Sequence, residues 1–431
     1  MVYTKDDILN MVAENDVKFI RLQFTDILGV FKNVAITVSQ LEKALNNQCM
    51  IDGSSISGFL GIEESDMYLK PDLDTFVIFP WRPQHGKVAR FICDVYTSDG
   101  KFFEGSPRYA LKKAVKRAEE MGYTFNVGPE CEFFLFQTDN NGNPTTIPHD
   151  NGTYFDLGPA DMGENARREI CLTLEDMGFE IETSHHEKAP GQHEVDFKYG
   201  EALRSADNIM TLKLVVKTVA QRNGLFASFM PKPLNGVNGS GMHTNFSLFK
   251  NGANAFYDPA DKNGLSLSKD AYMFMTGVIK HARGMAVVTN PVVNSYKRLI
   301  SGFGLPYSSV LDAAKGNGII RIPKSMPDNT RIELKFPDAA CNPYLEFAAI
   351  LSAGLDGIEK SMELAESLNG GIYEMPGNLG EAIAEFKKDN IIQRALGSHI
   401  AAKYTETKQR EWEEYQRAVT DWEVKKYLNV Y

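Results

Sequence analysis

Paired carboxylates close to an apolar strand are the first residues of this sequence that could do chemistry. The run 128-GPECEFFLF-136 places Glu130 and Glu132 two residues apart, so both side chains point to one face of a strand. The apolar residues that follow indicate a strand that is at least partly buried, where carboxylates are costly unless a cation pairs with them. The pair fits a cation site, although an exposed polar sheet edge would show the same spacing.

A second acidic group flanks a Pro-Gly turn in 184-SHHEKAPGQHEVDF-197. Glu187 and Glu194 stand on either side of this turn, and three histidines lie close by. The segment lacks the thiolate or histidine spacing of a zinc site. Carboxylates from separate strand ends suit a hard divalent ion such as Mg²⁺ or Mn²⁺, and a charged surface hairpin is the alternative.

A glycine-rich run, 236-GVNGSGMHTNFSLF-249, adds a histidine. Its glycines allow close backbone approach to a ligand. His243 then begins an alternating strand, with Asn245 and Ser247 on the same face. The loop precedes a strand and lacks the GK[ST] ending, which excludes a Walker site. A histidine satisfied within the core is the alternative reading.

The fourth segment, 330-TRIELKFPDAACNPY-344, alternates in charge. Strand geometry puts Arg331, Glu333 and Lys335 on one face, and Arg321 lies shortly upstream. A cross-strand ladder of salt bridges would explain the same row. Together the four segments offer five carboxylates, one histidine and several cations. A two-metal phosphoryl-transfer site needs such a set, because metal ions neutralise phosphate oxygens and arginines stabilise the migrating group.

The elements that must position these groups fall into two regions. Residues 1–103 are predicted to be mainly β after a capped helix that starts at Thr4, with strands near 18–24, 30–36, 75–79 and 87–96. Residues 104–431 form the second predicted domain. Its helices are expected near 107–121, 161–178, 203–223, 269–288 and 342–366. Its strands are expected near 124–136, 179–186, 193–199, 225–230, 241–249, 318–322 and 330–336. The pattern predicts an α+β or α/β domain with a large sheet, and a charged helical tail from residue 380.

Length and composition bound the function. A chain of 431 residues is long enough for two domains. Its formal net charge of −10 lacks the basic footprint of a nucleic-acid binder. Five scattered cysteines without a CxxC pair indicate a reducing compartment. No apolar run reaches the length of a membrane span, and the first residues do not read as a signal peptide, so we expect a cytoplasmic protein.

Long runs of this sequence resemble type I glutamine synthetases over essentially the whole chain. They include KFIRLQFTDILG (18–29), DGSSISGF (52–59), SHHEKAPGQHEVDFKY (184–199), FMPKPLNGVNGSGMHTN (229–245) and NPYLEFAAILSAGLDGI (342–358). The shorter α subgroup, which lacks an adenylylation insertion, is the most similar. The resemblance implies a small N-terminal β-grasp-like domain and a large catalytic domain with a curved, mainly antiparallel sheet and helices. It also implies a dodecamer of two stacked hexameric rings.

The resemblance also implies roles for individual residues. Two or more Mg²⁺ or Mn²⁺ ions would be held by Glu130, Glu132, Glu187, Glu194, His243 and Glu333. The nucleotide ATP would lie near Asn245 and Ser247, with Arg321 and Arg331 on its phosphates. Glutamate would be held by Asn238, Gly239, Arg298 and Lys335. Asp52 would act in the neighbouring subunit's site, binding ammonium and taking its proton. The implied reaction makes γ-glutamyl phosphate, from which ammonia then displaces phosphate.

Several positions depart from the family pattern. Gly304 stands where the family has a glutamate that closes over the site, and Gly316 replaces an arginine that reaches phosphate. Lys335 replaces an arginine and loses the guanidinium fork. Ser57 and Gly61 replace a glutamate and an arginine, the latter tied to feedback inhibition. One missing charged contact to a transition state commonly costs about 2.7–4 kcal/mol.

Three functions remain open from the sequence. The first is an ATP-dependent glutamate–ammonia ligase, weakened by these departures. The second is a γ-glutamyl ligase for a larger amine, with room where Gly304 replaces a bulky acid. The third is a catalytically silent homologue that keeps the ring and binds nucleotide. Such a chain would assemble with a complete synthetase or with a regulatory protein.

Overall fold

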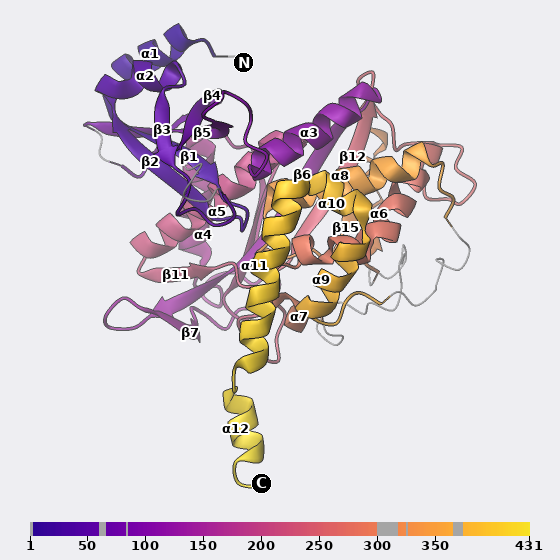
Figure 1. The fold of residues 1–431 in the computed structure, drawn as a ribbon. Helices are drawn as coiled ribbons and strands as arrows, with labels where there is room; N and C mark the ends of the chain where they lie inside the picture. The colour runs from indigo at the N-terminus through magenta and orange to yellow at the C-terminus, as the bar shows by residue number, and fades with distance from the viewer. Residues whose placement is uncertain (1–2, 60–65, 83–84, 300–317, 325, 365–373) are drawn as a thin grey trace.

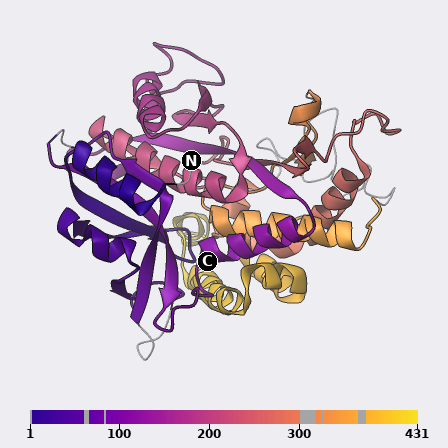
Figure 2. The same ribbon diagram turned by 90° about the horizontal axis from the view of Figure 1, so that it is seen from above.

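The computed structural model describes residues 3–59, 66–82, 85–299, 318–324, 326–364 and 374–431. Two sheets organise this part of the chain. Residues 17–97 form the first sheet, and residues 124–334 contribute the strands of the second (Figure 1). In both views the indigo N-terminal sheet lies on one side of the molecule and the orange helix α8 (Pro343–Glu359) lies on the other (Figure 1 and Figure 2).

The N-terminal sheet has five strands in the order β2-β1-β5-β4-β3. They are β1 (Val17–Thr25), β2 (Phe31–Thr37), β3 (Cys49–Asp52), β4 (Asp66–Ile78) and β5 (Lys87–Thr97). The central pair, β1 and β5, is parallel, and the other neighbours are antiparallel. Alternating residues of β1, such as Ile20 and Leu22, pack with helices α1 (Lys5–Glu14) and α2 (Leu41–Leu45) into a core of their own.

The predicted helix start at Thr4 is confirmed. The Asp7 backbone N–H donates to Thr4 Oγ1 at 3.2 Å, and the Thr4 N–H donates to Asp7 Oδ2 at 2.8 Å, which completes a capping box. Ser106 precedes Pro107 at the start of α3 (Pro107–Glu120), but its side chain makes no capping hydrogen bond.

A ten-stranded antiparallel sheet forms the centre of the larger part of the chain that follows the N-terminal sheet. Its main path, β14-β15-β12-β6-β9-β8, consists of β14 (Ile320–Arg321), β15 (Ile332–Leu334), β12 (Met242–Lys250), β6 (Thr124–Thr138), β9 (Gln192–Phe197) and β8 (Ile181–His186). Short strands extend it: β7 (Pro144–Pro148), β10 (Gly200–Glu201) and β11 (Leu225–Ser228) pair with β6, and β13 (Ala253–Asn254) pairs with β12. The long strand β6 is therefore the axis on which the sheet is built.

Helices pack against this sheet and share one large apolar core with it. Besides α3 and α8 they are α4 (Glu164–Asp176), α5 (Ala202–Arg222), α6 (Lys269–Thr289) and the short α7 (Ser295–Arg298). The chain ends in α9 (Leu379–Lys388), α10 (Asn390–Leu396), α11 (Ser398–Arg417) and α12 (Asp421–Tyr427). Helix α11 runs along the body, and α12 extends beyond it to the C-terminus (Figure 1).

The α+β prediction is confirmed, and some element bounds differ from it. β4 begins at Asp66, before the predicted strand near 75–79, and β3 was not predicted. Helix α8 ends at Glu359 rather than near 366, because Ser361 adopts a left-handed φ of 48° that turns the chain away. The boundary near residue 103 stays a prediction. None of the helices in the described ranges combines the length and the apolar character of a membrane span.

Candidate active site

Side chains on one face of the large sheet line a cavity of about 340 Å³, which we call the carboxylate pocket. Its lining includes all six predicted metal-binding residues: Glu130, Glu132, Glu187, Glu194, His243 and Glu333. Four sequence segments that are far apart in the chain therefore meet at one place. Glu130 and Glu132 share a face of β6, as their spacing predicts.

Strand register brings these side chains together in two groups. His243 on β12 lies opposite Glu130 on β6, and Glu333 on β15 joins them from the next strand. His185 on β8 lies opposite Glu194 on β9, with Glu187 just beyond the end of β8. Within each group, one ligand atom from each residue lies within 4.8 Å of the others, which is the reach of a single metal ion.

Glu132 connects the two groups. It lies opposite Glu194 in the β6–β9 pair. Its Oε2 accepts hydrogen bonds from Gln192 Nε2 at 2.8 Å and from the Gly241 backbone N–H at 2.7 Å. The carboxylate is therefore held in place by both neighbouring strands.

The carboxylates of this pocket lie close together, so their negative charges repel one another. Burial, together with the carboxylates of Asp196 and Glu132, raises the pKa of Glu194 to about 11. Burial also raises the pKa of Glu132, although His243 opposes that shift. A divalent cation would relieve this repulsion, and carboxylate oxygens with one imidazole in each group are a donor set that Mg²⁺ and Mn²⁺ accept. The residues present therefore fit a divalent metal centre.

Cations also line the carboxylate pocket. Arg298 is buried and donates to the backbone oxygens of Phe336 at 2.9 Å and Lys335 at 3.1 Å, which fixes its guanidinium. Arg321 Nη1 lies 2.7 Å from Glu333 Oε2, and Lys335 Nζ lies 4.0 Å from the other oxygen of Glu333. The pocket therefore places anion-binding groups beside the acidic ones.

Glycine is required where this arrangement is tightest. A Cβ on Gly239 would lie 2.1 Å from the Pro231 carbonyl oxygen. A Cβ on Gly241 would lie 2.6 Å from Arg298 Nη2 and 3.0 Å from His243 Nε2. The glycine-rich run thus allows the close backbone approach that the sequence predicts.

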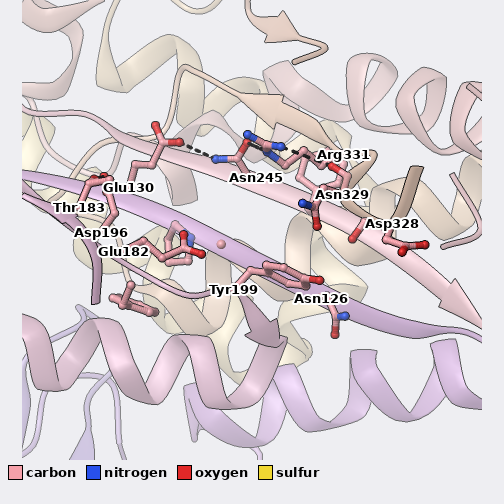
Figure 3. Close-up of a pocket in the computed structure, with 15 residues that line it drawn as sticks. Asn126, Glu130, Glu182, Thr183, Asp196, Tyr199, Asn245, Asp328, Asn329 and Arg331 are labelled. Atoms are coloured by element: carbon pink, nitrogen blue, oxygen red, sulfur yellow. Dashed lines mark hydrogen bonds between the residues drawn. The ribbon is translucent and has the colours of Figure 1, made fainter. Parts of the chain in front are cut away.

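A second cavity, of about 290 Å³, adjoins the first, and we call it the Tyr199 pocket (Figure 3). Glu130 and Asp196 line both cavities. Asn245 donates from Nδ2 to Glu130 Oε1 at 2.8 Å and accepts at Oδ1 from Arg331 Nε at 3.0 Å. Figure 3 shows this row of side chains facing Tyr199 across the pocket.

The remaining predicted site residues are divided between these places. Asn238, Gly239, Arg298, Arg321 and Lys335 line the carboxylate pocket, and Asn245, Ser247 and Arg331 line the Tyr199 pocket. Glu333 and Lys335, predicted to share a strand face with Arg331, line the carboxylate pocket. Arg331 lines the adjoining Tyr199 pocket, where it donates to Asn245, the partner of Glu333 in the β12–β15 pair.

Two of the residues singled out in the sequence do not line either pocket, and three others are not described by the structure. Asp52 ends β3 in the N-terminal sheet and does not line either pocket of its own chain. Ser57 is exposed. Gly61, Gly304 and Gly316 lie outside the described residues.

Sequence reasoning missed several residues that line the two pockets. His185, Tyr154 and Lys188 line the carboxylate pocket, and Tyr199 and Glu182 line the other. Strand alternation from Glu194 would have found Asp196 and Gln192, which share its face. Tyr154 comes from a loop, where no periodicity signals it.

Comparison with known proteins decides the family. The family model described as glutamine synthetase, catalytic domain, matches residues 104–427, and the one described as glutamine synthetase, beta-Grasp domain, matches residues 16–98. This chain belongs to the glutamine synthetase family. Its N-terminal sheet is the β-grasp domain of that family, and the ten-stranded sheet with its helices is the catalytic domain. Its length is consistent with the shorter subgroup of type I.

Relatives match over the full chain. It is 58% identical to a glutamine synthetase of Clostridium saccharobutylicum, covering 100% of this chain and 99% of that protein. It is 53% identical to a glutamine synthetase of Staphylococcus aureus with the same coverage. Among solved structures, a complex of GmaS with ADP has a TM-score of 0.88 at 33% identity, covering 98% of this chain and 99% of that one. Plasmodium falciparum glutamine synthetase has a TM-score of 0.88 at 25% identity, covering 99% of each chain.

Proposed function

We propose that this glutamine synthetase family member catalyses ATP-dependent ligation of glutamate and ammonia to glutamine through γ-glutamyl phosphate. The observation that carries the proposal is the meeting of two metal-ligand groups in one pocket, next to a second pocket that shares Glu130. A nucleotide in the second pocket would present its terminal phosphate where the metal ligands and the arginines converge. This arrangement suits phosphoryl transfer to a bound carboxylate.

Different residues of the protein would bind the glutamate, the phosphate and the nucleotide. We infer that Arg298, fixed by two backbone carbonyls, binds the glutamate carboxylate together with Asn238, Gly239 and Lys335. Arg321 and Arg331 stand at the carboxylate pocket and the Tyr199 pocket respectively, so they can contact phosphate from both sides of Glu130. Asn245 and Ser247 would contact the nucleotide itself.

Six residues would hold the divalent ions. Glu130, His243 and Glu333 form one ligand group, Glu187 and Glu194 belong to the other, and Glu132 lies between them. Mg²⁺ or Mn²⁺ bound there would neutralise phosphate oxygens during transfer. The raised pKa of Glu194 supports this assignment, because neighbouring carboxylates disfavour its ionised form, which a bound divalent cation would favour.

The position of Asp52 supports a site that is shared between subunits. It lies in the N-terminal domain, away from the lining of its own chain's pockets. We propose that it reaches the pocket of a neighbouring subunit, binds ammonium and takes its proton, in a dodecamer of two stacked hexameric rings. Mixed assembly with a complete synthetase or a regulatory protein remains part of this proposal. The five unpaired cysteines support a cytoplasmic location.

The two alternative functions are not favoured. The ligase for larger amines rests on Gly304, and the silent homologue rests on Gly304, Gly316 and Lys335; of these, Gly304 and Gly316 lie outside the described residues. Full-length identity of 58% to a glutamine synthetase supports ammonia as the acceptor. The metal-ligand groups and Arg298 are also present.

The test is phosphate release by the purified protein with ATP, Mg²⁺ and glutamate, with and without ammonium, together with direct measurement of glutamine. We expect ammonium-dependent release and matching glutamine, and loss of both in Glu132→Gln. Release that responds to larger amines but not to ammonium would support the wider acceptor. ATP binding without release would support the silent homologue, and Gly304→Glu with Gly316→Arg should then raise activity. Light scattering reports the size of the assembly.

A further inference from the structure

A buried polar cluster lies on the far side of the hairpin that carries Glu187 and Glu194. It consists of Asp150, Asp161, Arg167, His186 and His193, and none of these residues is more than 6% exposed. His186 and His193 are opposite each other in the β8–β9 pair. Because side chains alternate along a strand, these histidines face away from the carboxylate pocket while their neighbours face into it.

Asp150 ties together both ends of the turn between β8 and β9. Its Oδ1 lies 2.9 Å from His186 Nε2 and accepts the Gly191 backbone N–H at 2.9 Å. The other ring nitrogen, His186 Nδ1, lies 2.6 Å from the backbone oxygen of Glu187. A chain of hydrogen bonds therefore runs from Asp150 through His186 to the backbone of a pocket carboxylate.

The rest of the buried cluster contacts β9, the second strand of the hairpin. Arg167 Nη1 donates to Asp161 Oδ2 at 2.6 Å and to His193 Nδ1 at 3.0 Å. His193 is the residue next to Glu194, so the strand that carries Glu194 is anchored from behind. The backbone makes room for both histidines: a Cβ on Gly152 would lie 2.7 Å from His186 Nε2, and one on Gly163 would lie 2.5 Å from His193 Cε1.

The cluster could be mistaken for a metal site. Asp150, Asp161, His186 and His193 each offer a ligand atom, and these atoms lie within 4.8 Å of one another. The guanidinium of Arg167 already contacts Asp161 and His193, so a cation of the protein occupies this centre. A second cation would meet repulsion from Arg167.

We propose that Asp150 is a positioning residue for the divalent-metal centre: through His186 and Gly191 it sets the shape of the turn and so the spacing of Glu187 and Glu194. This inference rests on the proposed function, since it assumes that these carboxylates bind metal. Groups that orient metal ligands from behind usually matter to affinity by about 10- to 100-fold. Asp150 does not touch the substrate or the ion in this arrangement.

The experiment measures binding of Mn²⁺ alone by electron paramagnetic resonance titration, well below the melting temperature. We expect Asp150→Ala to raise the Kd for Mn²⁺ by about 10- to 100-fold. Asp150→Asn keeps an acceptor for His186 and Gly191, so it should recover most of that loss. The control is Asp389→Ala, which removes the carboxylate paired with His281 at a distance in the helical part of the chain. That variant should lower the melting temperature without changing the Kd.

The outcomes separate the two proposals. Wild-type protein that binds no Mn²⁺ would overturn the proposed function, and this inference with it. Wild-type binding with an unchanged Kd in Asp150→Ala would overturn this inference alone. If Asp150→Ala does not fold, His186→Asn decides, because its shorter side chain loses the contact to Asp150: a raised Kd supports the positioning role, and a wild-type Kd overturns it.

Discussion

His281 shows how one side chain depends on the groups around it. Its Nδ1 lies 2.6 Å from Asp389 Oδ2, and its Nε2 lies 3.1 Å from Asp356 Oδ2, with Lys360 on the outer oxygen of Asp356. Burial alone would lower the pKa of His281, but the hydrogen bonds to the two carboxylates raise it above 6.5. The charged imidazole thus connects α6, α8 and the start of α10.

This residue predicts a pH-dependent stability. A pKa that is higher in the folded state stabilises the fold fully below the unfolded value near 6.5, and the effect is lost as pH rises through the folded pKa. We therefore expect the difference in melting temperature between wild type and His281→Asn to be largest at about pH 6 and to shrink toward about pH 9. A constant difference over this range would contradict the charged pairing.

At the scale of single residues, the sequence identified those pocket residues whose positions follow from local spacing. Glu130 and Glu132 share a face because strand spacing requires it, and Glu187 and Glu194 flank a turn that is visible in the sequence. Gln192 and Tyr154 were missed. Gln192 shares a strand face with Glu194, so alternation could have found it, whereas Tyr154 lies in a loop whose neighbours no spacing rule reveals.

At the scale of elements, α6 and α8 approach each other at glycines. A Cβ on Gly357 would lie 2.0 Å from the Met273 backbone oxygen, and a Cβ on Gly277 would lie 2.2 Å from the Ala353 backbone oxygen. These neighbours are backbone atoms within helices, so they cannot move aside as a side chain can. The two helices are the most apolar layer over the active-site sheet.

Gly357→Ala should therefore destabilise the fold by about 1–3 kcal/mol through overpacking. Urea unfolding followed by circular dichroism measures this change. Gly200→Ala is the matched control, because its Cβ would meet only Ser205 Oγ at 3.9 Å. Equal stability of the two variants would show that the helices separate without penalty.

Elements were predicted well where periodicity is clean and poorly where charge interrupts it. The helices α3, α5 and α6 match their apolar stripes closely. The first half of β4, DMYLKPD, was missed because Pro71 and its charged neighbours look unlike a strand. Pairing with β5 on one side and β3 on the other makes it a strand nonetheless.

At the scale of the whole molecule, Arg108 joins the N-terminal sheet to helices of the rest of the chain. From α3 it reaches Asp72 on β4 at 2.7 Å, Asp94 on β5 at 2.8 Å and Asp207 on α5 at 2.9 Å. Arg108 is 4% exposed. Asn342 adds a second connection by donating to the backbone oxygen of Asp26 at 3.1 Å. Residues this distant in sequence gave no sign that they would meet.

Arg108→Met should cost about 3–5 kcal/mol, because it leaves buried carboxylates without their cation. Lys198→Met, which breaks an exposed pair with Glu180, should leave the melting temperature almost unchanged, because water screens such a pair. Differential scanning calorimetry compares the two. A melting temperature for Arg108→Met as high as that of Lys198→Met would mean that the domains hold together without this ion-pair network.

The position of Glu130 matters for ligands in both cavities. Its carboxylate borders both the carboxylate pocket and the Tyr199 pocket, and Asn245 connects it to Arg331. A ligand that shifts Glu130 from one side changes the affinity for a ligand on the other. Thermodynamic reciprocity requires the reverse effect to be of equal size. We therefore expect ligand binding in the two pockets to be linked through Glu130.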